Sequence, residues 1–140
     1  MARGVLGVVA GWIVWLVGFM ALAIGLAAVW PEYRVHGQAW MNNHIFDFPT
    51  NMAVVNVLFW ILAEVAAGWL AMVVARRREA VWVLAAIVVG YLGYEHFYAE
   101  WANIPAWYNL AVVIAAIPAV LLGARLAGRS AHPVRPAPAA

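Results

Sequence analysis

Four long apolar segments constrain the fold of this chain more than any other feature. The predicted spans are residues 5–30, 52–75, 80–98 and 107–125. A hydrocarbon core about 30 Å thick needs roughly 20 residues of helix to cross it. Because lipid offers the backbone no water to bond, such segments must satisfy their amides internally as helices. We therefore predict an all-α integral membrane protein, a bundle of four transmembrane helices.

The composition supports lipid as the main solvent of this chain. Of the 140 residues, 68% are hydrophobic and 10% are charged. Soluble domains are roughly 45–50% apolar and about 25% charged. The net charge of +2 is small, so we expect no nucleic-acid partner. Cysteine is absent, which excludes disulfides and thiolate chemistry.

The arginines predict the orientation of the helices. With four spans, all but one of the arginines fall on a single side of the membrane, and Arg34 falls on the other. The positive-inside rule then puts both termini in the cytoplasm, N-in and C-in. We expect a multi-pass protein of the bacterial cytoplasmic (inner) membrane. The side opposite the arginine-rich one is called the outer side below.

The domain organisation is simple. Residues 1–127 are expected to form one transmembrane domain. Residues 128–140 are rich in Pro and Ala without periodicity, which is typical of a disordered tail, here a cytoplasmic one. Thr50 or Asn51 is expected to cap the second span, since either side chain accepts a bond from a free backbone amide.

Glu64 is the most unusual residue of the second span. A carboxylate at bilayer depth costs on the order of 3 kcal/mol and usually marks a site, a pathway or a partner. Asn56, Trp60 and Glu64 are spaced by four and so lie on one helix face. No basic residue lies at the depth of Glu64. We therefore expect its carboxyl group to be protonated, or hydrogen-bonded to Tyr or Trp.

Polar and aromatic residues of the third and fourth spans predict a pocket on the outer side that reaches inward to Glu64. Glu95 shares a helix face with two tyrosines. Glu64 and Glu95 are the candidate catalytic groups for acid–base chemistry. A pocket of aromatic walls with few polar groups suits a small apolar or amphipathic ligand. The candidate ligand-binding residues are Asn56, Trp60, Tyr91, Tyr94, Tyr98 and Asn109.

A metal site is a further hypothesis. Its candidate ligands are His44, Asp47, His96 and Glu100. Imidazole and carboxylate donors suit zinc or non-haem iron. Of these residues, only His96 and Glu100 stand one helical turn apart. The sequence identifies no cofactor.

Other functions stay open at this point. The chain is also interpretable as a proton-coupled or cation-handling small transporter acting as an oligomer, or as a structural subunit of a larger membrane complex. Its polar residues would then be a proton path or interhelical hydrogen bonds. Gly7 and Gly11 have the GxxxG spacing, which permits close approach of another helix, either within the chain or from a second copy. Membrane lipid is the one partner expected in every case.

Overall fold

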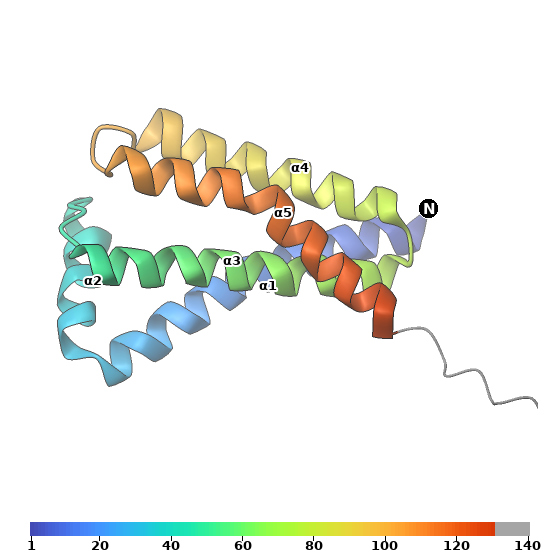
Figure 1. Ribbon diagram of the computed structural model, residues 1–140, viewed down its shortest axis with the longest axis horizontal. Helices are drawn as coiled ribbons and strands as arrows, with labels where there is room; N and C mark the ends of the chain where they lie inside the picture. Colours follow the sequence, from blue (N-terminus) through green and yellow to red (C-terminus); the bar gives the residue numbers. More distant parts are fainter. Residues whose placement is uncertain (131–140) are drawn as a thin grey trace, which may run out of the picture.

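The computed structural model describes residues 1–130 and is helical throughout that range apart from short links (Figure 1). Four helices are long and apolar enough to cross a membrane, which confirms the all-α four-helix prediction. The elements are α1 (Ala2–Val29), α2 (Pro31–Asn43), α3 (Thr50–Ala75), α4 (Arg78–Tyr94), the π-helical η1 (Glu95–Ala99) and α5 (Ala106–Ser130).

One helix was not predicted. The segment after the first span forms α2. Its first residue is Pro31, and Glu32 lies in its first turn. A fixed φ and an early acidic residue both favour a helix start. The helix ends at His44, whose φ of 53° lies in the left-handed region. Because α2 is short and mostly polar, hydropathy does not detect it.

The helix ends differ from expectation in two places. The predicted cap by Thr50 or Asn51 is wrong, because α3 begins at Thr50 itself after Pro49 and no side chain caps it. Helix α5 continues to Ser130, past the expected end of the last span at 125 and into the predicted tail. The remainder of that tail, residues 131–140, lies outside the described residues.

Two glycines of α1 pack against α3. A Cβ atom at Gly7 would lie 2.6 Å from the Cβ atom of Ala75. At Gly11 it would lie 3.0 Å from the carbonyl oxygen of Ala67. Only glycine permits this approach of two backbones. The GxxxG spacing therefore serves packing within the chain.

A second close crossing joins α3 to α5. Gly68 lies directly on the backbone of Val120, and Gly123 lies on the carbonyl group of Val65. A methyl group fits at neither glycine. Pro118 lies inside α5 near this crossing, and the helix bends there in Figure 1. Proline removes a backbone hydrogen bond and commonly bends a helix.

The bundle is tight at one end and open at the other. At the arginine end, Arg3 of α1 lies near Arg76 and Arg77. Toward the other end α1 leaves α3: a Cβ atom at Gly18 would stay 3.8 Å from Ala63, and one at Gly25 would meet nothing within 4 Å. Figure 1 shows α1 slanting away and α2 turned across its end. We call this the pocket end. Whether it faces outward stays a prediction.

The glycine crossing gives a test of the fold. We expect Gly68→Ala and Gly123→Ala each to lower the free energy of unfolding by about 1–3 kcal/mol, because the added methyl group overlaps backbone atoms. Gly90→Ala on α4 is the matched control, since a Cβ atom there meets nothing within 4 Å. Thermal unfolding in detergent micelles measures the effect. Equal melting temperatures for all three variants would contradict this packing.

Candidate functional site

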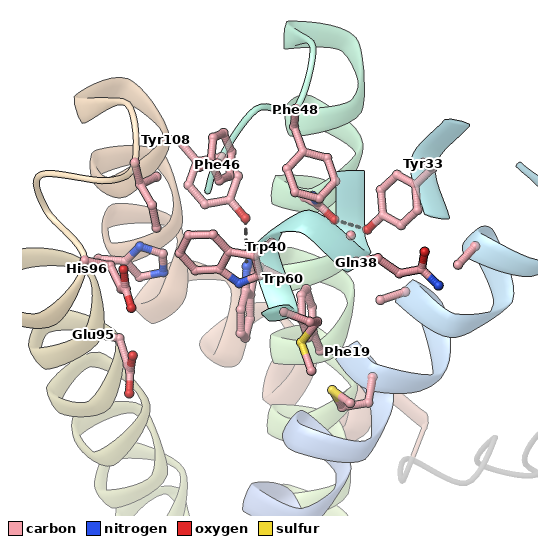
Figure 2. A pocket seen from close by; sticks show the side chains of 18 of the residues that line it. Phe19, Tyr33, Gln38, Trp40, Phe46, Phe48, Trp60, Glu95, His96 and Tyr108 are labelled. Carbon is pink, nitrogen blue, oxygen red and sulfur yellow. Dashed lines mark hydrogen bonds between the residues drawn. The ribbon is translucent and has the colours of Figure 1, made fainter. Parts of the chain in front are cut away.

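A cavity of about 430 Å³ lies at the pocket end. All helices contribute to its wall, together with the link between α2 and α3 (Figure 2). Most of the wall is aromatic or aliphatic. The aromatic side chains include Phe19, Trp40, Phe46, Phe48, Trp60 and Tyr108.

Aromatic contacts hold the pocket wall together. The rings of Phe19 and Trp60 stack with centroids 3.8 Å apart, which joins α1 to α3. Trp60 Nε1 donates a hydrogen bond of 3.2 Å to the Tyr108 hydroxyl, which joins α3 to α5. Phe46, from the link after α2, packs on Tyr108 with centroids 4.9 Å apart. Large rings of this kind fix the wall at little cost in side-chain entropy.

One hydrogen bond ties α2 to α3 at the pocket. The Tyr33 hydroxyl donates to Asn56 Oδ1, and both side chains are buried. Burial raises the pKa of Tyr33, while the hydrogen bond to Asn56 acts in the opposite direction. The phenol therefore stays protonated near neutral pH and keeps its role as donor. Asn56 lines the pocket as predicted.

The π-helical turn η1 contributes two side chains to the pocket. Its wider turn is closed by the amide of Glu100, which donates to the carbonyl oxygen of Glu95 at 2.8 Å. Glu95 has an ordinary helical backbone, with φ −60° and ψ −52°, so it and His96 diverge by about 100° around the axis. Here both line the pocket, and Figure 2 shows them projecting from the same wall. Single π turns of this kind are frequent at functional sites.

His96 is oriented by Asn109. His96 Nδ1 lies 2.7 Å from Asn109 Oδ1, and Asn109 Nδ2 donates to the carbonyl oxygen of Ile104 at 3.3 Å. Because Asn109 Nδ2 donates to a carbonyl oxygen, the atom that faces His96 is the amide oxygen, which can only accept. In a neutral His96 ring, Nδ1 must therefore carry the proton. Nε2 is then an acceptor. It has no hydrogen-bond partner among residues 1–128, and His96 lines the pocket, so Nε2 is available there.

The predicted metal ligands do not assemble. His44 pairs with Glu100 at 3.2 Å, and a separate pair joins His36 to Asp47 at 2.9 Å. The third candidate, His96, is bonded to Asn109 and not to Glu100. Within residues 1–130 no three His, Asp or Glu side chains gather to hold an ion. The four-residue metal hypothesis is therefore wrong for the described part of the chain.

Glu64 lies outside the pocket, which corrects the prediction that the pocket reaches it. Its side chain is fully buried, and neither carboxyl oxygen has a hydrogen-bond partner among the described residues. Trp15 lies at the same depth, since Gly11 before it faces Ala67 and Gly18 after it faces Ala63. The Trp15 ring packs 5.4 Å from Trp60, which lines the pocket. The pocket thus ends on an aromatic floor above Glu64.

Three other predicted ligand-binding residues do not line the pocket. Tyr94 and Tyr98 stack on each other with centroids 5.3 Å apart, and they are 57% and 79% exposed. Asn109 is buried behind His96 and acts on the pocket through that ring. The predicted residues that do line it are Asn56, Trp60, Tyr91, Glu95, His96 and Glu100.

Helix α2 supplies several of the pocket residues that sequence reasoning missed. Tyr33, Arg34, Gln38 and Trp40 all line the pocket. The signal that could have found them is the Pro31–Glu32 helix start, which hydropathy ignores. No protein-family model, curated protein or solved structure matches this chain. The chemistry of the pocket itself is therefore the basis of the proposed function.

The two buried polar residues at and below the pocket should respond differently to apolar replacement. Asn109→Leu leaves His96 Nδ1 and a carbonyl unpaired, so we expect a loss of about 1–3 kcal/mol in unfolding free energy. Glu64→Met removes a carboxyl group that has no partner, so we expect a gain of about 1–3 kcal/mol. Thermal unfolding of both variants measures this. A loss of stability in Glu64→Met would show that the carboxyl group is held by a partner.

Proposed function

We propose that this protein binds a small amphipathic molecule from the membrane in the cavity at the pocket end. The main evidence is that one cavity has an apolar wall and a polar wall. Its α1 wall is apolar, with Phe19, Met20 and Ile24, whereas Glu95 and His96 stand on the η1 wall. A cavity of about 430 Å³ lies within the roughly 300–1,000 Å³ range of small-molecule sites.

The ligand is proposed to enter from the lipid. Met20 and Ile24 line the cavity and are also 48% and 63% exposed on the surface of the bundle. Such side chains face lipid in a transmembrane bundle, so the cavity communicates with the acyl-chain region. An apolar tail would lie along α1, with the polar head toward η1. This arrangement requires no passage through water.

The setting of this activity is proposed to be the bacterial cytoplasmic membrane, with the pocket end outward. The support is the arginine bias, since Arg3 and the Arg76–Arg78 cluster lie at the opposite end from the pocket. Catalysis on the ligand would use His96 and Glu95, which stand together on one wall. A neutral imidazole with a free Nε2 is suited to accept a proton.

The transporter alternative has one observation in its favour, the two unpartnered oxygens of buried Glu64. Intramembrane carboxyl groups are common in proton relays. Against it, the aromatic floor of Trp15, Trp60 and Tyr91 lies between the pocket and Glu64. Binding in the pocket is therefore the better supported proposal.

Filling the cavity tests the proposed function. We expect Ala23→Trp to abolish retention of a membrane-derived amphiphile, because Ala23 lines the cavity and an indole ring would occupy it. Ala21→Trp is the matched control, since Ala21 is exposed on the same helix and does not line the cavity. Native mass spectrometry of protein extracted in mild detergent measures the bound mass. Equal occupancy in both variants would contradict the proposal.

A further inference from the structure

The pocket carries charges of both signs on different walls. Arg34 lines it from α2, while Glu95 and Glu100 line it from the η1 wall. Within residues 1–128 the ion pairs are the two that histidines form with Asp47 and Glu100, and none includes Arg34 or Glu95. A cation and an anion thus face one cavity without neutralising each other. Groups of this kind bind complementary charge when a ligand brings it.

The η1 wall offers hydrogen-bond acceptors. Glu100 has both carboxylate oxygens engaged, with Oε1 near His44 at 3.2 Å and Oε2 accepting from Asn103 at 2.9 Å. Glu95, whose carboxylate also interacts with Tyr91, and His96 Nε2 are therefore the acceptors that a ligand can meet. Asn109 keeps Nε2 in the accepting form. Two adjacent acceptors, one of them anionic, match a group that carries positive charge and several N–H donors.

We propose that the pocket recognises a zwitterionic lipid headgroup, with a primary ammonium at Glu95 and His96 and a phosphate at Arg34. This inference rests on the proposed function and names its ligand class. Arginine binds phosphate through its planar fork of donors. The ammonium group donates to the Glu95 carboxylate and to His96 Nε2. The acyl chain lies along the α1 wall beside Phe19 and Met20.

Other headgroups fit these walls less well. A quaternary ammonium has no N–H donor, so it would leave His96 Nε2 without a hydrogen bond inside the cavity and would donate none to Glu95. An anionic headgroup without an amine would pair with Arg34 and leave Glu95 uncompensated. A simple amine would leave Arg34 uncompensated. Only a headgroup with both charges and free N–H groups satisfies the two walls together.

A competition experiment tests the headgroup. The wild-type protein in a neutral maltoside detergent is mixed with equimolar lysophosphatidylethanolamine, lysophosphatidylcholine and lysophosphatidylglycerol, all with the same acyl chain. Native mass spectrometry then measures how much of each lipid is bound. We expect the ethanolamine lipid to exceed each of the others by about tenfold, the size of one charge-assisted hydrogen bond. Equal binding of all three would overturn the headgroup assignment while leaving amphiphile binding intact.

Two charge variants test which wall binds the ammonium and which binds the phosphate. Thermal unfolding checks that both variants are folded. Glu95→Gln should bring the ethanolamine-to-choline ratio close to one. Arg34→Gln should weaken all three lipids and leave that ratio unchanged, because each of them carries the phosphate. An unaltered ratio in Glu95→Gln would overturn the ammonium site, and undiminished binding in Arg34→Gln would overturn the phosphate site. If wild type binds no more lysolipid than Ala23→Trp, the proposed function itself fails.

Discussion

The contact of α3 with its two neighbours through small residues is the constraint on which the rest of this structure depends. Lipid provides no hydrophobic force between helices, so they associate by close packing. Gly7 and Gly11 bring α1 onto α3, and Gly68 and Gly123 bring α5 onto it. All four contacts lie toward the arginine end. Because the glycines hold α1 close to α3 there, whereas α1 stands farther from α3 at Gly18 and Gly25, α1 diverges at the other end, and the cavity lies in the space that results.

The second determining feature is the polar wall that η1 contributes to the cavity. The π turn spans Glu95–Ala99, and Glu95 and His96 both line the cavity although they are adjacent in sequence. His96 Nδ1 donates to Asn109 Oδ1 on α5, and Asn109 Nδ2 donates to the carbonyl oxygen of Ile104. Because Asn109 is bonded at both its amide oxygen and its amide nitrogen, the His96 ring has one defined orientation. A polar site of this precision within an apolar bundle is consistent with recognition of a polar headgroup.

Sequence reasoning could predict the parts of this molecule that depend on long apolar runs. The four spans followed from hydropathy, and the i, i+4 stripe identified Asn56 and Trp60 as pocket residues. It failed where local geometry departs from a regular α-helix or from a hydropathy signal. The π turn cannot be read from a period of 3.6 residues, and α2 is too polar for a hydropathy search. Glu64 was wrongly assigned to the pocket because helix spacing predicts only that it shares a helix face with Asn56 and Trp60. The spacing does not show that the packed rings of Trp15 and Trp60 close the pocket above it.

A structure from crystals grown in a lipid mesophase tests the central claim most directly, because it shows whether a membrane molecule occupies the cavity. The account predicts elongated density that runs from Phe19 and Ile24 to a polar end beside Glu95 and His96, with His96 bonded to Asn109. A cavity closed by α2 and its neighbours, with lipid density only on the outside of the bundle, would contradict it.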